Sequence, residues 1–238
     1  MIRTVWLSDG RSLAKFTVPG SLTRCQQAGH QVVGMHIITN SSRGHDQVIP
    51  VLVLAAGAST RMGRPKALLP LGNGILLDRA VEQARILSRD VRVVCGAGYP
   101  LIRFRCSRQP LAWVPAPDWH SGLSASLVAG LESLGPGVPG VFVLLADQPL
   151  LDLQALAALG VAARSVPHQA VAADYDGRPG VPAYLPRWLW PQIMALSGDR
   201  GAGAVLAQAG ATRVEIPGVL EDVDTPEDWL RVRSRLLR

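Results

Sequence analysis

The sequence is poor in cysteine and in charge, and it has no long apolar segment. Its three cysteines include no C-x-x-C pair, and an odd, sparse set predicts no disulfide framework. No apolar run approaches the ~20 residues that cross a bilayer. Met1–Leu13 carries Asp9 and Arg11 in place of the apolar core of a signal peptide. These absences predict a soluble, cytoplasmic protein in a reducing compartment.

Charged residues make up only 18% of the chain, and the formal net charge is +6. The positive charges are scattered as single arginines, such as Arg92, Arg103, Arg105 and Arg108. No basic block interleaved with aromatic residues appears, although that pattern is typical of nucleic-acid-binding proteins. We therefore expect small polyanions such as NTPs as partners, with no nucleic acid and no membrane.

The chain changes character near Val48. Residues 1–47 mix His, Gln, Ser and Gly without clear periodicity. We interpret them as an N-terminal extension that is either disordered or a misassigned start. Residues 48–238 suit a single domain of ordinary size.

Within this domain, apolar strand patterns alternate with helical periodicity. Strands are expected over Ile49–Ala55, Val91–Cys95, Trp113–Pro115, Val141–Ala146 and Arg213–Ile216. Helices are expected over Leu76–Leu87, Ser121–Leu134, Leu153–Ala163, Trp188–Leu196 and Ala202–Ala209, and from Thr225-Pro226 onward, where Asp228 completes a capping box. A hairpin is expected from Ala170–Tyr175 and Val181–Leu185 around the loop Asp176–Gly180. The alternation predicts an α/β fold: a three-layer α/β/α arrangement around a mostly parallel sheet. Ligands of such sheets bind beyond the carboxyl ends of the strands.

The strongest signal follows the first of these strands, where Leu54–Lys66 reads L-A-A-G-A-S-T-R-M-G-R-P-K. Small residues there allow backbone N–H groups to approach a phosphate closely, and Arg61 and Lys66 add positive charge. The segment is no Walker A loop, because five residues separate Gly57 from Gly63, and it lacks the dinucleotide pattern G-x-G-x-x-G. The alternative to a phosphate loop is a plain turn from strand to helix.

This segment resembles the signature of the MobA-like nucleotidyltransferases, L-A-A-G-x-S-x-R-M-G-x-P-K-x-L-L-P, through Pro70. The resemblance spans about residues 50–235 and continues in family order with Asp118–Leu127, Leu145–Pro149, Gly198–Ala202 and Asp222–Asp228. It implies a Rossmann-like sheet of the nucleotide-diphospho-sugar transferase type. Within the family the pattern looks most like the molybdenum cofactor cytidylyltransferases, since guanylyltransferase relatives usually read L-A-G-G in the first motif.

Two carboxylates are candidates for a metal. Asp147 ends an apolar strand, where a carboxylate is costly unless it is paired or bound to a metal. Mg²⁺ prefers one or two carboxylates together with phosphate oxygens and waters. Asp224, in the D-x-D turn before the last helix, is the natural second ligand, and the resemblance assigns both positions to Mg²⁺. The alternatives are a cap or turn role for Asp147 and capping of the last helix by Asp222 or Asp224.

The resemblance also implies the remaining site residues. Arg61, Lys66 and Asp147 would be catalytic. The nucleotide would be bound by Leu54, Ala55, Ala56, Gly57, Ser59, Arg61, Lys66, Gly122, Ser124 and Ser126, the last three at a helix N-terminus with free N–H groups. Ordinary capping by Ser121 is the alternative there. The acceptor would be bound by Arg178, Gly180, Pro182 and Asp199. Many cytidylyltransferases have His where this chain has Val181, which leaves the acceptor open.

The implied reaction is attack by an acceptor phosphate on the α-phosphorus of an NTP, with release of pyrophosphate. The most specific expectation is CTP with molybdenum-bound molybdopterin and Mg²⁺. The product is the cytosine dinucleotide cofactor of xanthine-dehydrogenase-type enzymes, so such an enzyme or its chaperone is a hypothesised partner.

Alternatives are GTP or a sugar phosphate as substrate, a non-catalytic nucleotide-binding regulator, and a nicotinamide oxidoreductase using Gly96-Ala97-Gly98. The intact Lys66, Asp147 and Asp224 disfavour the regulator, and a missing third glycine disfavours the oxidoreductase. His120 and His168 are interpreted as surface or loop residues.

Overall fold

The computed structural model describes residues 2–8, 13–19 and 48–236. The chain divides into two units, Met1–Arg43 and Gly44–Arg238. In the first unit, strands β1 (Ile2–Ser8) and β2 (Leu13–Pro19) pair in antiparallel fashion, with Ile2 opposite Pro19. The other residues of the expected extension lie outside the described residues.

One mixed sheet of seven strands forms the centre of the second unit, in the order β11-β9-β10-β8-β3-β6-β7. The strands are β3 (Val51–Ala55), β6 (Val91–Cys95), β7 (Ala112–Pro115), β8 (Gly140–Leu145), β9 (Val171–Tyr175), β10 (Arg178–Pro186) and β11 (Thr212–Val214). Within this sheet β10 runs antiparallel to both of its neighbours, while the other neighbouring pairs are parallel. The expected mostly parallel sheet is therefore confirmed. A small hairpin of β4 (Pro70–Leu71) and β5 (Gly74–Ile75) lies apart from it.

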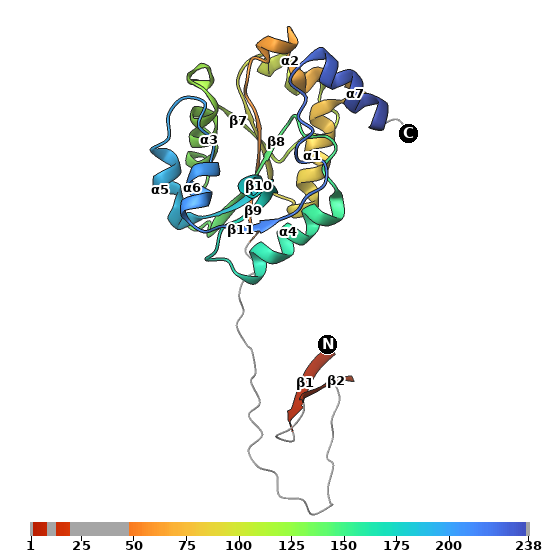
Figure 1. Ribbon diagram of the computed structural model, residues 1–238, viewed down its shortest axis with the longest axis vertical. Coiled ribbons are helices and arrows are strands. Elements are labelled where there is room, and N and C mark those ends of the chain that lie inside the picture. Colours follow the sequence, from red (N-terminus) through yellow and green to blue (C-terminus); the bar gives the residue numbers. More distant parts are fainter. Residues whose placement is uncertain (1, 9–12, 20–47, 237–238) are drawn as a thin grey trace, which may run out of the picture. The chain divides into compact units, whose positions relative to one another are not determined.

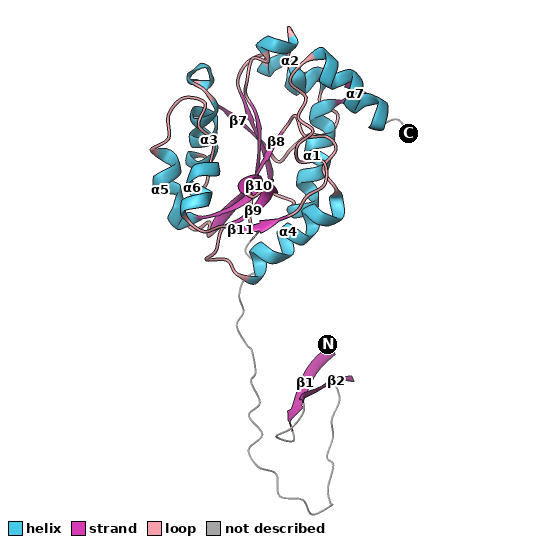
Figure 2. Cartoon of the chain, viewed as in Figure 1, coloured by secondary structure: helices cyan, strands magenta, loops and turns pink. Residues whose placement is uncertain are grey.

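Helices cover both faces of this sheet, which gives the three layers seen in Figures 1 and 2. One face carries α1 (Leu76–Leu87) and α4 (Leu153–Ser165). The opposite face carries α3 (Leu123–Glu132), α5 (Trp190–Met194) and α6 (Gly203–Gln208). The remaining helices are α2 (Tyr99–Arg105) and α7 (Pro226–Leu236), and the 3₁₀ turns are η1 (Thr60–Met62), η2 (Lys66–Leu68), η3 (Trp119–Ser121) and η4 (Arg187–Leu189).

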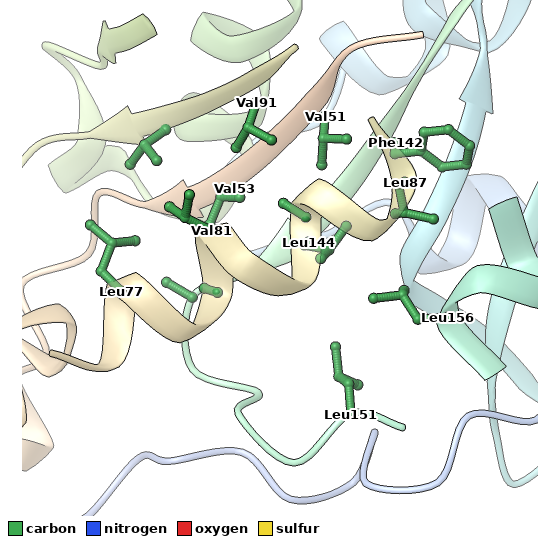
Figure 3. Close-up of a cluster of buried hydrophobic side chains, with 14 of the residues drawn as sticks. Val51, Val53, Leu77, Val81, Leu87, Val91, Phe142, Leu144, Leu151 and Leu156 are labelled. Atoms are coloured by element: carbon green, nitrogen blue, oxygen red, sulfur yellow. The ribbon is translucent and has the colours of Figure 1, made fainter. Parts of the chain in front are cut away.

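The core under α1 explains why the central strands are so apolar. Leu77, Val81 and Ala84 repeat at helical spacing and face the sheet, and all three are fully buried. They contact a cluster that includes Val53 and Leu144, also fully buried (Figure 3). Strands covered by helices on both faces need apolar side chains in both directions, which is the continuous pattern of β3 and β8.

Several elements have the expected bounds, and others correct the prediction. The helix Leu76–Leu87 and the strand Val91–Cys95 are confirmed to the residue. The expected helix Ser121–Leu134 begins only at Leu123, because Gly122 has φ +109°, outside the helical region. The expected helix Trp188–Leu196 is divided into η4 and α5.

The hairpin between β9 and β10 has a shorter loop than expected. Asp176 and Gly177 form the turn with φ of 50° and 88°, and β10 already begins at Arg178. Two consecutive positive φ values are typical of the Asp-Gly type I′ turn, which matches the twist of the flanking strands. Arg178 and Gly180 therefore belong to a strand, and the expected loop over Asp176–Gly180 is wrong at its carboxyl end.

Candidate active site

A cavity of about 620 Å³ lies at the carboxyl ends of β3 and β8, where the sequence predicts a ligand site. Its volume is typical of small-molecule sites. Most of the nucleotide, metal and catalytic residues expected from the sequence line it, from four separate segments: Leu54, Ala55, Ala56, Gly57, Ser59, Arg61, Lys66, Gly122, Ser126, Asp147 and Asp224.

The Lys66 ammonium is the centre of this cavity's charge cluster. Its Nζ lies 2.6 Å from Oδ2 of Asp147 and 2.7 Å from Oδ1 of Asp224. Burial alone would lower the pKa of Lys66, but the two carboxylates outweigh burial and raise it above its ordinary value. The hydrogen bond from Lys66 holds the pKa of Asp224 below its ordinary value. Lys66 is therefore a cation at neutral pH, and it offsets part of the negative charge of the carboxylates on either side.

Two backbone features bring Asp224 beside Asp147. The N–H of Val223 donates to the carbonyl of Asp147 at 3.0 Å, which fixes the D-x-D turn against the end of β8. Thr225 and Asp228 then form the expected capping box: Asp228 N donates to Thr225 Oγ1, and Thr225 N donates to Asp228 Oδ2. Since Thr225 caps α7, the carboxylate of Asp224 is left to bind the two cations.

The glycine-rich loop (Ala56–Pro65) is closed by Ser59. This residue has a left-handed backbone with φ 56°, and its Oγ accepts the Lys66 N–H at 3.0 Å. The bond fixes Lys66 at the start of η2, with its side chain in the cavity. Arg61 contacts Oδ2 of Asp224 at 2.7 Å while its side chain stays 72% exposed. The loop thus supplies one half-buried cation and one exposed cation to the same site.

The carboxylates fit a hard divalent cation. Oδ1 of Asp147 is buried, and no hydrogen-bond donor within the described part of the chain reaches it. Asp147 and Asp224 contact the same ammonium, so their oxygens are close enough to share a cation. No group of three metal-ligating side chains occurs among the described residues. A pair of carboxylates completed by phosphate oxygens and water is nevertheless the usual Mg²⁺ arrangement.

Asp222 and Gln148 lie behind this pair and were not predicted as site residues. The Nε2 of Gln148, almost fully buried, donates to Asp222 Oδ1 at 2.9 Å and to the Tyr175 hydroxyl at 2.7 Å. Burial, and then the charge of Asp147, raise the pKa of Asp222 to about 6. The D-x-D spacing was the one sequence signal, since it places a second carboxylate next to Asp224.

The segment before α3 forms the opposite wall. Trp119 and His120 line the cavity, and His120 is exposed, as expected of a surface residue. Gly122 and Ser126 also line it, whereas the N–H and Oγ of Ser124 both donate to the Gly198 carbonyl. That contact draws the Gly198–Asp199 turn over the helix start.

Of the four acceptor residues implied by the resemblance, Asp199 lies on the cavity wall. Arg178, Gly180 and Pro182 lie on β10, near a cis bond between Val181 and Pro182, and are not among the described residues that line the cavity. The Tyr175 hydroxyl donates to the Val181 carbonyl and accepts from Gln148, which connects this part of β10 to the segment after Asp147.

Comparison with curated proteins identifies relatives that match most of the chain. "Purine catabolism protein PucB" of Bacillus subtilis (strain 168) is 31% identical over 205 residues, 77% of this chain and 95% of the relative. "Nicotine blue oxidoreductase" of Paenarthrobacter nicotinovorans is 32% identical over 195 residues, 76% and 94% of the two chains. "Molybdenum cofactor cytidylyltransferase" of Escherichia coli (strain K12) is 24% identical over 190 residues, 79% and 96%.

Solved structures share the fold. A homologue of Mycobacterium tuberculosis Rv0371c from Mycobacterium sp. strain JC1 has a TM-score of 0.68 at 29% identity, covering 80% of this chain and 97% of that one. A manganese complex of Rv0371c itself has a TM-score of 0.65 at 24% identity, covering 79% and 98%. No described helix has the length and apolarity to span a membrane.

The profile of the MobA-like NTP transferase domain matches residues 51–214, which include the glycine-rich loop, Lys66 and Asp147. The chain therefore belongs to the MobA-like NTP transferases and is a nucleotidyltransferase of that family.

Proposed function

We propose that this nucleotidyltransferase moves CMP from CTP to a phosphorylated acceptor, with molybdenum-bound molybdopterin as the foremost candidate, in a Mg²⁺-dependent reaction in the cytoplasm. The observation that carries the proposal is the ion cluster in which Lys66 joins Asp147 and Asp224 inside the cavity lined by the glycine-rich loop. One site therefore contains cations that can hold a triphosphate and carboxylates that can hold a metal. Nucleotidyl transfer requires both.

This reaction depends on the positioning of the acceptor phosphate and the triphosphate more than on proton transfer. An acceptor phosphate oxygen attacks the α-phosphorus in line, a new P–O bond forms, and the bond to the bridging oxygen breaks. The electron pair of that bond leaves with pyrophosphate. Because a phosphate oxygen is already a nucleophile, no general base is needed. Arg61, Lys66 and the backbone N–H groups of the loop would hold the triphosphate and stabilise its developing charge.

Asp147 and Asp224 would hold the divalent cation. When bound, such an ion polarises phosphoryl oxygens and reduces the repulsion between two anionic reactants. The buried, unpartnered Oδ1 of Asp147 supports this role, because a buried carboxylate oxygen without a donor is costly unless something else satisfies it. The manganese found in the Rv0371c structure supports divalent metal use in that protein.

The substrates rest on the family pattern. The first motif reads Leu54-Ala55-Ala56-Gly57, which resembles the cytidylyltransferases, since guanylyltransferase relatives usually read L-A-G-G there. A relative named molybdenum cofactor cytidylyltransferase is matched over 96% of its length. Another relative is named for purine catabolism. Xanthine is a purine, so that name agrees with a xanthine-dehydrogenase-type molybdoenzyme, or its chaperone, as the partner that takes up the product.

A second candidate is an oxidoreductase, because one relative carries that name at 32% identity. The turn Gly96–Gly98, the segment best suited to a nicotinamide cofactor, is not among the described residues that line the cavity. A Cβ added at Gly96 would lie 2.5 Å from the Trp119 ring, so that glycine is explained by close packing. Binding of NADH, with its oxidation when nicotine blue is added, would favour this candidate.

Pyrophosphate release tests the proposal. The assay compares CTP, GTP, ATP and UTP with candidate acceptors for the wild type, Lys66→Ala and Asp147→Ala. We expect CTP-selective release that falls by about 10²–10³ in each variant, as when one transition-state contact is lost. Unchanged release by Asp147→Ala would remove the metal assignment, and preference for GTP would move the chain to the guanylyltransferases.

A further inference from the structure

The ammonium of Lys66 occupies the position that a shared cation would take. It bonds to one oxygen of each metal-ligand candidate, at 2.6 Å from Asp147 and 2.7 Å from Asp224. Mg²⁺ binds carboxylate oxygens at about 2.1 Å and demands a near-octahedral set of ligands around itself. A metal that bridges the same two oxygens would need the same lone pairs and the same space. Lysine and metal therefore compete for this position.

Three of the four oxygens of this carboxylate pair already contact a cation. Asp147 Oδ2 and Asp224 Oδ1 bind Lys66, and Asp224 Oδ2 binds Arg61. Asp147 Oδ1 is the one oxygen of the pair without a donor among the described residues, and it is buried. Lys66 and Arg61 thus offset two of three neighbouring carboxylates, and Asp222 is the third. What stands against a divalent ion here is therefore the occupation of these oxygens and not a lack of negative charge.

Lys66 is held through its backbone as well as through its ammonium. Its backbone N–H is fixed by Ser59 Oγ, so the start of η2 stays in place when the side chain rotates. Lysine carries its charge on a flexible stem of four carbons. The glycine-rich loop lines the same cavity, so a triphosphate bound there lies within the lysine's neighbourhood and competes for its charge.

We propose that Lys66 is a stand-in counter-ion for the carboxylate pair, and that a nucleotide triphosphate must draw the ammonium away before a divalent cation binds there tightly. This inference rests on the proposed function and adds an order of binding to it: nucleotide first, or nucleotide and metal together, and not metal alone. The site is then protected from metal loading until the substrate has arrived.

Manganese binding to the full-length protein tests this order, with the electron paramagnetic resonance of free Mn²⁺ as the readout. The proteins are the wild type and Lys66→Met, which keeps a similar stem but has no charge. Each is titrated with Mn²⁺ alone and with a non-hydrolysable α,β-methylene analogue of CTP, corrected for Mn²⁺ bound by the analogue itself. We expect Lys66→Met to bind Mn²⁺ alone about tenfold tighter than the wild type, and the analogue to tighten binding about tenfold in the wild type only. Equal affinity of both proteins for Mn²⁺ alone would overturn the inference.

Arg61→Met is the matched control. It also removes one positive charge from Asp224, but it leaves the lysine bridge intact. We expect only a small change in its affinity for Mn²⁺ alone. A gain as large as that of Lys66→Met would show that net charge, and not occupation by the ammonium, sets the affinity, and the inference would be wrong.

Thermal melting covers the case in which Lys66→Met does not fold. Lys66→Gln is the second variant, and for either one Mn²⁺ alone should raise the melting temperature, since a ligand that binds only the folded state stabilises it. The wild type should be stabilised only when the CTP analogue is also present. Stabilisation of the wild type by Mn²⁺ alone to the same extent would contradict the proposed order while leaving the proposed function intact. Absence of any nucleotide effect, together with absent pyrophosphate release, would instead defeat the proposed function itself.

Discussion

Of the carboxylates around Lys66, Asp147 is the one on which the proposed reaction depends most directly. Asp147→Asn keeps the size of the side chain and removes its charge. We expect pyrophosphate release to fall by about 10²–10³, because in the proposed reaction the divalent cation would lose a ligand and Lys66 would lose its partner at 2.6 Å. A steady-state pyrophosphate assay measures this loss, and circular dichroism checks that the variant is folded.

Asp152→Asn is the control for this change. Asp152 lies five residues further on and accepts the Ala155 N–H at the start of α4, outside the cavity lining. Asparagine caps helices about as well as aspartate, so activity should match that of the wild type. A loss of activity as large as that of Asp147→Asn would show that the effect is structural.

Asp78 gives the protein a separate dependence on pH. Its oxygens accept the N–H of Ile75 at 2.8 Å and the N–H of Arg108 at 2.7 Å. Burial alone would raise the pKa of Asp78, but these hydrogen bonds outweigh burial and lower it below its ordinary value. A folded pKa below the unfolded one, near 3.9, means that the ionised form stabilises the fold above about pH 4 and that this stabilisation is lost as pH falls through the folded pKa.

We therefore expect the free energy of unfolding of the wild type to fall more steeply below about pH 4 than that of Asp78→Asn. Urea unfolding of both proteins between about pH 2 and pH 7 measures the difference. Well above about pH 4, Asp78→Asn should be less stable than the wild type by a constant amount. Parallel pH profiles of the two proteins would contradict the role given to these hydrogen bonds.

The sequence predicts which residues belong to the candidate site better than it predicts which groups each of them contacts. Lys66, Asp147 and Asp224 are recognisable because charged groups follow apolar strands and turns in the family order. Their mutual contact depends on a long-range bond between Val223 N and the Asp147 carbonyl, and no local pattern encodes such a bond. For the same reason Gln148 is visible as part of a motif, while its amide bonds to Asp222 and Tyr175 are not.

At the scale of elements, the junction between η3 and α3 is tightly constrained. Gly122 has φ +109°, and a Cβ there would lie 2.4 Å from the carbonyl carbon of Gly198. We expect Gly122→Ala to lower the free energy of unfolding by about 1–3 kcal/mol, the usual cost of such backbone strain. It should also weaken nucleotide binding, since Gly122 and the neighbouring Asp199 line the cavity. Urea unfolding and nucleotide titration measure the two effects.

Gly135→Ala is the matched control, because its Cβ would meet no heavy atom within 4 Å and its φ is not positive. Its stability should be unchanged or higher by up to about 1 kcal/mol, through a less flexible unfolded chain. Equal behaviour of Gly122→Ala and Gly135→Ala would show that the junction tolerates a side chain.

Elements with strong periodicity are the ones that the sequence predicts well. Helix α1 places its apolar residues at regular intervals over twelve residues, so its bounds can be predicted. Helix α2 has only seven residues and a single buried one, Ile102, so it shows no periodic stripe and was not predicted. The turn at Asp176-Gly177 was placed but made too long, because Pro179 and Gly180 resemble loop residues although they pair with β9.

At the scale of the whole molecule, the described part of the second unit holds every residue of the proposed reaction. The cavity and the core clusters draw on residues from Ile49 to Leu236. We therefore predict that a chain beginning at Val48 melts at the same temperature as the full chain and releases pyrophosphate at the same rate. Differential scanning calorimetry and the pyrophosphate assay check this, and loss of both properties would assign residues 1–47 an essential part.

The fate of the α-phosphate tests the central claim most directly. CTP labelled with ³²P at the α-position is incubated with the protein, Mg²⁺ and the acceptor, in parallel with CTP labelled at the γ-position. We expect the α-label to move to the acceptor, the γ-label to appear in pyrophosphate, and both transfers to be lost in Lys66→Ala. Transfer of the γ-label to the acceptor, or equal α-label transfer by wild type and Lys66→Ala, would contradict it.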